Sequence, residues 1–281
     1  MLQSAQEPSK LILIDTGVDT RESKGILEKE IKAIDSSLSL SNIDWIIPTH
    51  AHVDHIGASK SLKDLSKAQI MMHRDEYDYF SSNMSIHWID KLETYGVSKT
   101  FIELAKPHLK RYRDYIKEFE PDIRFNGQKG QIRDPLPEPL DFIQIPGHSP
   151  HHLAFLDYQQ KVMISGDTIL SEISPTLGFS KWEADSVKDY LHTLDLLKTS
   201  FKDWTAYPAH QRIVTDIGGR VDQLVKLYDE RLSLVEKLLQ EKEQYKMKEL
   251  VQAIYPGTWE IPDQQFLAVM ETVAYLKYFK Q

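Results

Sequence analysis

The sequence predicts an α/β fold that carries a small helical appendage at its C-terminal end. Three observations point to this class: short apolar runs alternate with stretches of helical spacing, a long helical segment interrupts the alternation, and the chain after Gly218-Gly219 has helical spacing. Short apolar runs are typical of buried strands, and strands that alternate with helices form α/β domains. The length of 281 residues allows a main domain of residues 11–217 and a helical domain of residues 218–281.

The first part of the chain supplies three predicted strands with helices between them. Each strand is a short apolar run bounded by turn residues, and each helix has apolar side chains three and four positions apart. The strands are expected at Leu11–Ile14, residues 43–48 and residues 68–72, and the helices at residues 24–36 and 57–65.

Beyond the third strand the pattern changes. Residues 74–120 have helical spacing and many aromatic side chains, which predicts a helical insertion, and we expect it to lie over the functional site as a lid or pocket wall. Strands are expected again near Ile132 and at residues 141–145, 153–157, 161–165 and 205–207, with a helix at residues 186–197 and final helices at residues 220–243, 247–254 and 264–278.

Composition excludes several classes of protein. The chain has no cysteine, so disulfides, thiolate metal sites and cysteine nucleophiles are ruled out. No apolar run approaches the roughly 20 residues of a membrane span, and no secretion signal is visible, so we expect a cytoplasmic protein without a membrane partner. The formal charge of −8 disfavours nucleic acid, because phosphate backbones are bound through Lys and Arg. The expected partner is a small-molecule substrate.

A dense group of metal-ligand side chains follows the second predicted strand. His50, His52, Asp54 and His55 stand where the strand runs into a helix. Alternation along the extended part places His50 and His52 on one side, and the turn into the helix lets Asp54 and His55 face a second point nearby. Neutral imidazole and carboxylate suit zinc, and also iron or manganese. A surface loop rich in histidine by chance would not explain the strand, the turn and the downstream partners together.

Three more candidate ligands, His148, Asp167 and His210, each stand just after a later predicted strand. Open α/β sheets usually collect their site residues from the ends of successive strands. Each of these positions is weak by itself, but their order along the chain is informative. The expected metal site consists of His50, His52, Asp54, His55, His148, Asp167 and His210.

The ordered set of HxHxDH, GH, GD and a late AH resembles the metallo-β-lactamase superfamily. The resemblance covers about residues 11–214, where Asp15-Thr16-Gly17 matches the family's turn after an early strand. It implies an αββα sandwich. Members normally have two strands before that turn and its strand, so the N-terminal edge strands are expected to be missing here. The residues around His148 and the helical tail look most like the branch with a small winged-helix-like domain, similar to hydroxyacylglutathione hydrolases.

The resemblance also implies how two divalent ions, zinc first among them, would share the ligands. The first ion would take His50, His52 and His148, the second would take Asp54, His55 and His210, and Asp167 would bridge them. Three unshared protein ligands per ion leave open positions for water, and a shared carboxylate offsets the repulsion between two cations. Such a pair lowers the pKa of water toward neutrality, and Asp54 would orient the resulting hydroxide and accept its proton.

Three functions remain open at this point. The first is hydrolysis of a small carbonyl compound, namely a thioester, lactone or other ester, by a metal-bound hydroxide. The second is an endoribonuclease, and the third is a non-hydrolytic iron oxidoreductase of the same fold. Acidic charge without a basic stripe favours the first over the second. The presence of both Asp54 and His55 argues against the flavodiiron ligand pattern.

The remaining histidines and the tail are interpreted as structural. His73 is a candidate eighth ligand but is expected instead to be a hydrogen-bonded histidine at a strand end. One of His151 and His152 is a candidate to donate its ring N–H to a ligand carboxylate or a backbone carbonyl, but His152 is expected simply to pack beside the site. His87 is only a candidate for the pocket. The tail is expected to be a packing or dimerisation element rather than a contact for nucleic acid. Its predicted apolar face comprises Leu224, Leu227, Leu232, Val235, Leu250, Ile254, Leu267, Val273 and Leu276.

Overall fold

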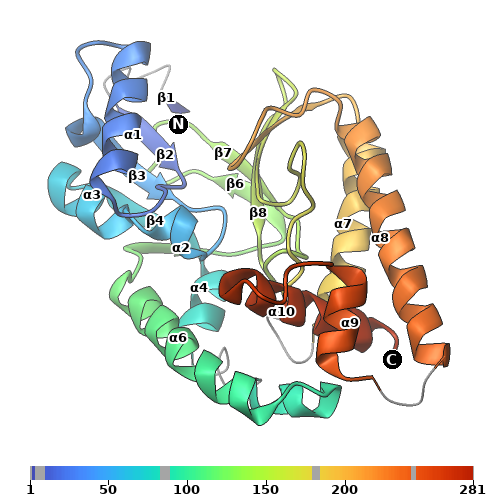
Figure 1. Cartoon of the computed structure of the whole chain (residues 1–281). Helices are drawn as coiled ribbons and strands as arrows, with labels where there is room; N and C mark the ends of the chain where they lie inside the picture. The colour runs from blue at the N-terminus through green and yellow to red at the C-terminus, as the bar shows by residue number, and fades with distance from the viewer. Residues whose placement is uncertain (1, 4–9, 83–88, 179–183, 242–244, 281) are drawn as a thin grey trace.

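Two five-stranded sheets face each other, and helices cover the outer side of each, which makes an αββα sandwich (Figure 1). The computed structural model describes residues 2–3, 10–82, 89–178, 184–241 and 245–280. The predicted fold class is confirmed. Among the helices of these residues, none is long and apolar enough to cross a membrane.

The first sheet is parallel except at its N-terminal edge. Its strands, in spatial order, are β1 (Leu2–Gln3), β2 (Leu11–Ile14), β3 (Ile43–Ile47), β4 (Gln69–His73) and β5 (Ile123–Phe125). Only β1 is antiparallel to its neighbour. Leu11 and Leu13 pack under α1 (Arg21–Ile34) and α3 (Ser59–Ser66), whereas Ile12 and Ile14 face the other sheet, because side chains alternate along a strand.

The second sheet is antiparallel except for one pair. Its strands, in spatial order, are β10 (Thr205–Pro208), β9 (Val162–Gly166), β8 (Leu153–Asp157), β7 (Leu140–Gln144) and β6 (Lys129–Ile132). Only β10 and β9 run parallel. Helices α7 (Ser186–Ser200) and α8 (Ile217–Glu241) pack against each other beside this sheet (Figure 1). Trp45, Phe142 and Phe155 fill the interior between the two sheets.

Two short strands of the first sheet were not predicted. Members of the superfamily that the sequence resembles normally have two edge strands before β2, and both were expected to be missing here. The described residues before β2 instead form one edge strand, β1, in which Leu2 lies opposite Ile12. The other strand, β5, has three residues and extends the sheet beyond β4. Strands of two or three residues are too short to show the alternation on which a prediction depends.

In residues 74–82 and 89–120, the described part of the predicted helical insertion, the structure has α4 (Arg74–Ser81), the 3-10 helix η2 (Ile89–Tyr95) and α6 (Lys99–Glu118). The insertion packs against the loop that follows β3. The Tyr112 hydroxyl donates a hydrogen bond to the carbonyl of Ala51 at 2.5 Å, and the Phe80 ring lies 6.0 Å from the His52 ring between centroids. The insertion therefore flanks the metal-ligand motif.

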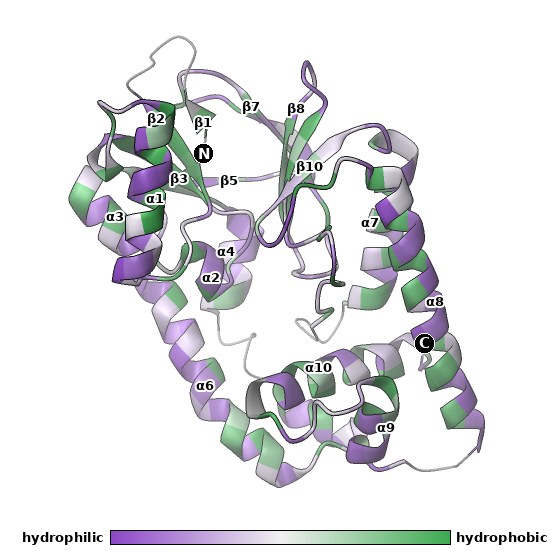
Figure 2. Ribbon diagram, turned by 45° about the horizontal axis from the view of Figure 1, so that its top comes forward, coloured by the Kyte–Doolittle hydropathy of each residue, from purple (hydrophilic) through white to green (hydrophobic). Residues whose placement is uncertain are grey.

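The tail contains α8, α9 (Met247–Ile254) and α10 (Pro262–Tyr278). No strand that could form a wing is found in residues 217–241 and 245–280. Buried side chains of these helices join the same apolar cluster as Leu156 of β8 and Val187 of α7, so the tail shares a core with the sandwich. Figure 2 shows that the tail helices combine hydrophobic and hydrophilic sides. Of the nine side chains predicted to be apolar contacts, Leu227 and Ile254 are half-buried and Leu267 is 48% exposed.

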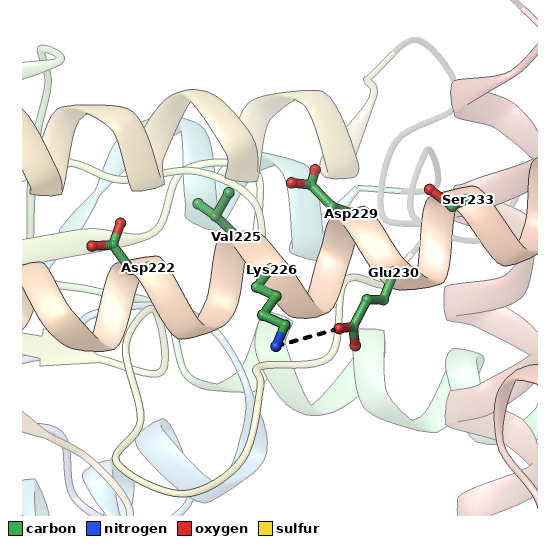
Figure 3. A pocket seen from close by; sticks show the side chains of 6 residues that line it. All are labelled: Asp222, Val225, Lys226, Asp229, Glu230 and Ser233. Carbon is green, nitrogen blue, oxygen red and sulfur yellow. Dashed lines mark ion pairs between the residues drawn. The ribbon is translucent and has the colours of Figure 1, made fainter.

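The outward side of α8 is polar and mostly acidic (Figure 3). Asp222, Asp229 and Glu230 lie beside a hollow on this helix, where Lys226 forms an ion pair with Glu230 at 3.8 Å. A phosphate backbone is bound by clustered cations, whereas the residues that line this hollow supply three carboxylates and one ammonium group, and Lys198 of α7 is already paired with Asp222. The surface shown in Figure 3 is therefore poorly suited to nucleic acid.

Candidate metal centre

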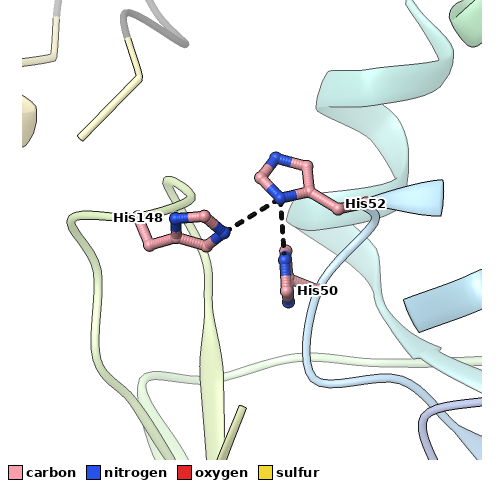
Figure 4. Close-up of side chains that lie close together, drawn as sticks. All are labelled: His50, His52 and His148. Carbon is pink, nitrogen blue, oxygen red and sulfur yellow. Dashed lines mark hydrogen bonds between the residues drawn. The ribbon is translucent and has the colours of Figure 1, made fainter. Parts of the chain in front are cut away.

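Three histidines from two strand ends converge at one point. His50 and His52 follow β3, and His148 follows β7. His52 Nδ1 lies 2.9 Å from His50 Nε2 and 2.9 Å from His148 Nε2 (Figure 4). Burial lowers the pKa of each ring, so all three are neutral at pH 7 and present lone pairs, the form in which imidazole binds metal ions. We call these residues the first ligand group.

The second ligand group consists of Asp54, His55, Asp167 and His210, whose ligand atoms all lie within 4.8 Å of one another. Asp54 and His55 belong to the short helix α2 (Val53–Ile56), while Asp167 and His210 follow β9 and β10. Asp54 Oδ2 lies 3.2 Å from His210 Nε2. The structure thus brings together all seven side chains that the sequence predicted as metal ligands.

Asp167 lies between the two groups. Its Oδ2 is 3.5 Å from His148 Nε2 of the first group and 3.4 Å from His55 Nε2 of the second, and its Oδ1 is 3.6 Å from His210 Nε2. Burial raises the pKa of Asp167, but the surrounding histidines, above all His55, outweigh burial and hold it below its usual value. An ionised carboxylate in this position can serve both groups.

Two buried atoms of the second group fit a metal ion. His55 Nε2 and Asp167 Oδ1 have no hydrogen-bond partner among the described residues, although buried polar atoms normally have one. Burial lowers the pKa of His55, but the carboxylates of Asp15 and Asp167 outweigh burial and raise it to about 10. The site therefore attracts positive charge at the point where a cation would bind. Imidazole and carboxylate without thiolate suit zinc, iron or manganese.

Asp15 holds two of the histidines in the tautomer that metal binding requires. Its carboxylate accepts a hydrogen bond from His55 Nδ1 at 2.8 Å and another from the Thr49 hydroxyl at 2.9 Å, and that hydroxyl lies 3.0 Å from His50 Nδ1. With Nδ1 engaged in this way, Nε2 of each ring is left for a metal ion. Asp15 has φ 57°, in the left-handed region that Asp tolerates better than most residues.

His152 holds the backbone of Asp167 rather than simply packing. Its Nε2 accepts a hydrogen bond from the backbone N–H of Asp167 at 3.1 Å, and its ring stacks on the His50 ring with centroids 4.6 Å apart. The prediction that His152 only packs is therefore wrong. The contact was not visible in the sequence because the pairing of β8 with β9 is what brings His152 beside Asp167.

Gly166 leaves the space in which this contact forms. Its φ is 50°, and a Cβ there would lie 2.7 Å from both His152 Nε2 and Thr49 Oγ1. We expect Gly166→Ala to destabilise the fold by about 1–3 kcal/mol, as overpacking does, and to lower the metal content. Gly178→Ala is the control, because a Cβ at Gly178 meets nothing within 4 Å. Thermal unfolding and metal analysis check this prediction, and identical results for the two variants would contradict it.

The loop after β9 orients His148. His148 Nδ1 donates a hydrogen bond to the carbonyl of Thr176 at 2.9 Å, which leaves Nε2 for a metal ion. The neighbouring carbonyl of Pro175 accepts a hydrogen bond from the Tyr228 hydroxyl of α8 at 2.8 Å. The tail thus contacts the loop that positions a predicted ligand. No sequence pattern indicated that the Thr176 carbonyl would orient a ligand. His87, which the sequence suggested as a pocket residue, lies outside the described residues.

A cavity of about 1290 Å³ opens beside the second ligand group and extends between the two sheets. Asp54, His55 and His210 line it, together with apolar side chains such as Ile14 and Phe155. Neither lysine nor arginine occurs among its described lining residues, whereas the lining carboxylates are Asp15, Asp54, Glu138, Asp141 and Asp157. The cavity is therefore suited to a small substrate that carries little negative charge.

Seven clustered imidazole and carboxylate side chains on an αββα sandwich are typical of metal-dependent enzymes. The sequence profile of the Metallo-beta-lactamase superfamily matches residues 5–210. The chain belongs to this superfamily and is a metal-dependent hydrolase.

Individual relatives are similar but distant. The probable metallo-hydrolase YqjP of Bacillus subtilis is 23% identical over 95% of this chain and 83% of its own. The hydroxyacylglutathione hydrolase GloC of Haemophilus influenzae is 24% identical over 46% of this chain and 50% of its own. The metallo-beta-lactamase family protein TTHA1429 of Thermus thermophilus has a similar structure, with a TM-score of 0.75 and 24% identity over 99% of this chain and 86% of its own.

Proposed function

We propose that this protein is a dinuclear metal-dependent hydrolase that cleaves a small carbonyl substrate, namely a thioester, lactone or other ester. The observation that carries the proposal is the position of Asp167, within 3.5 Å of a ligand nitrogen in each group. Two divalent ions bound there would activate water at neutral pH and polarise the carbonyl oxygen. Zinc is the proposed ion because five of the seven proposed ligands are imidazoles, and iron and manganese are the alternatives.

Asp54 is the proposed proton acceptor. Its side chain is 50% exposed and lines the cavity, so a substrate and a water molecule can both reach it. The hydrogen bond with His210 is the main cause that lowers the pKa of Asp54, which keeps the carboxylate ionised at neutral pH. An ionised carboxylate beside the ligand groups can orient the attacking water and take its proton.

The cavity supports a carbonyl substrate over a nucleic acid. An RNA strand carries one negative charge per nucleotide and is normally held by Lys and Arg, whereas the described residues that line this cavity include five carboxylates and neither lysine nor arginine. Within the carbonyl class, the name of the similar protein GloC supports a thioester.

A substrate panel tests the proposal. Zinc-loaded protein should hydrolyse at least one among acyl thioesters, lactones and carboxylic esters, and it should leave bis(4-nitrophenyl) phosphate and single-stranded RNA intact. His50→Ala, which removes a ligand of the first group, should abolish the same activity. Cleavage of RNA without carbonyl hydrolysis would contradict the proposal and would favour the endoribonuclease instead.

A further inference from the structure

We propose that His73, Asp75 and His151 form a separate site for a third divalent transition-metal ion of the zinc type. One ring nitrogen from each histidine and one carboxylate oxygen of Asp75 all lie within 4.8 Å of one another. His73 ends β4, Asp75 lies in the first turn of α4, and His151 lies between β7 and β8. None of the three belongs to the two ligand groups described above, so the proposal does not depend on the proposed function.

His73 is arranged as a metal-binding histidine would be. Its side chain is buried, its Nε2 lies 3.1 Å from the carbonyl of Gly127, and its Nδ1 is buried without a hydrogen-bond partner among the described residues. Metal-binding histidines usually donate their second ring N–H to a carbonyl or carboxylate. The Gln144 amide nitrogen lies 3.1 Å from Nε2 and donates a hydrogen bond to the same Gly127 carbonyl at 3.3 Å, so His73 Nε2 and this amide share one acceptor. Nδ1 is thereby left as the ligand atom.

His151 is held in place from its backbone. Its N–H donates a hydrogen bond to Glu76 Oε2 at 3.1 Å, and Glu76 Oε1 accepts another from the N–H of Ala51 at 3.1 Å. The imidazole ring of His151 lies almost parallel to that of His73, with centroids 5.9 Å apart and an angle of 18°. The backbone of His151 and the ring of His73 are therefore held in place before any ion binds. An ion between them and Asp75 would tie the start of α4 to the loop that carries His148.

The ligand types select the ion. Two imidazoles and one carboxylate suit zinc, iron or manganese, whereas calcium and magnesium prefer oxygen ligands throughout. Asp75 is exposed, so an ion can enter from solvent and complete its coordination with water. This is the open arrangement of three protein ligands that zinc adopts when a water molecule occupies its fourth position.

Zinc stoichiometry tests the third site. Full-length metal-free protein is loaded with zinc, desalted and analysed, as wild type, Asp75→Asn, His151→Gln and Asp78→Asn. The last variant is the control, because Asp78 lies on the same helix with its side chain 52% exposed and pairs with Arg124 instead. We expect Asp75→Asn and His151→Gln to bind one equivalent fewer than wild type, and Asp78→Asn to bind as many as wild type.

The comparison between variants isolates this site from the dinuclear centre. A difference of one equivalent supports the third site whatever number of ions the seven ligands take. Melting temperatures of the metal-free proteins should be equal for Asp75→Asn and Asp78→Asn, and zinc should raise that of Asp78→Asn further. Equal zinc content in all four proteins would overturn the proposal, as would loss of an equivalent in Asp78→Asn alone.

Discussion

Asp167→Asn should abolish hydrolysis and remove metal from both ligand groups. The carboxylate of Asp167 reaches ligand nitrogens of His148, His55 and His210 within 3.6 Å. A neutral amide cannot offset the repulsion between two cations, and its nitrogen end cannot act as a ligand. Substituting a residue that only supports a metal ligand commonly lowers metal affinity or activity by about 10- to 100-fold. We therefore expect the loss of this ligand itself to lower activity by more than about 100-fold.

Turnover and zinc content of purified Asp167→Asn, measured under the same conditions as wild type, check this prediction. Asp195→Asn serves as the matched control, because Asp195 is exposed on α7, away from both ligand groups. It should retain both wild-type activity and wild-type zinc. Wild-type turnover by Asp167→Asn would remove this residue from the site and with it the dinuclear interpretation.

Glu271→Ala should destabilise the protein by about 3–5 kcal/mol, the usual cost of removing one partner from a buried ion pair. Glu271 Oε1 lies 3.5 Å from Arg231 Nη1, and the two side chains are 7% and 19% exposed. The Tyr275 hydroxyl donates a further hydrogen bond to Glu271 at 3.1 Å. Burial raises the pKa of Glu271, and Arg231 and the tyrosines offset that effect only in part. Without the carboxylate, a buried guanidinium would lack its counterion.

The same substitution should also weaken metal binding in the first ligand group. Arg231 Nη1 donates to Ser174 Oγ at 3.2 Å, two residues before Thr176, whose carbonyl accepts the hydrogen bond of His148. Displacing Arg231 would loosen this loop and therefore the orientation of His148. The contact explains how a helical tail outside the sandwich can influence the metal centre.

Urea unfolding and zinc competition titrations measure the two effects of Glu271→Ala. Glu230→Ala is the control, since this exposed residue of α8 forms an i,i+4 ion pair with Lys226. Its substitution should lower the free energy of unfolding by no more than about 0.5 kcal/mol. If Glu271→Ala lowers stability but leaves zinc affinity unchanged, the tail does not act on His148. A free energy of unfolding equal to that of wild type would contradict the role of the ion pair itself.

Features that depend on local pattern could be predicted from the sequence. The apolar runs at Leu11–Ile14 and Leu153–Asp157 form β2 and β8 with the predicted bounds, and the helix expected at residues 247–254 forms α9. The seven candidate ligands were found because each follows a strand, and the fold gathers strand ends at one edge. The positions of these residues after predicted strands were therefore enough to identify them as candidate ligands.

Contacts that depend on the tertiary fold could not be predicted in the same way. The hydrogen bond of Asp15 with His55 joins residues 40 positions apart, and that of His148 with Thr176 joins residues 28 apart. The helical period also misplaced Leu267, which was predicted to lie on the apolar face of its helix and is 48% exposed. Residues 268–276 of α10 are all buried, because α7, α8, α9 and η2 surround this helix, so it has no single apolar stripe that a helical period could identify.

Anomalous diffraction from crystals of the zinc-loaded protein tests most directly whether two metal ions share Asp167. We expect two peaks about 3.5–4 Å apart, as in other two-metal sites, on either side of the Asp167 carboxylate. One peak should lie among His50, His52 and His148, and the other among Asp54, His55 and His210. A single peak at these residues, or none in a fully loaded crystal, would contradict such sharing.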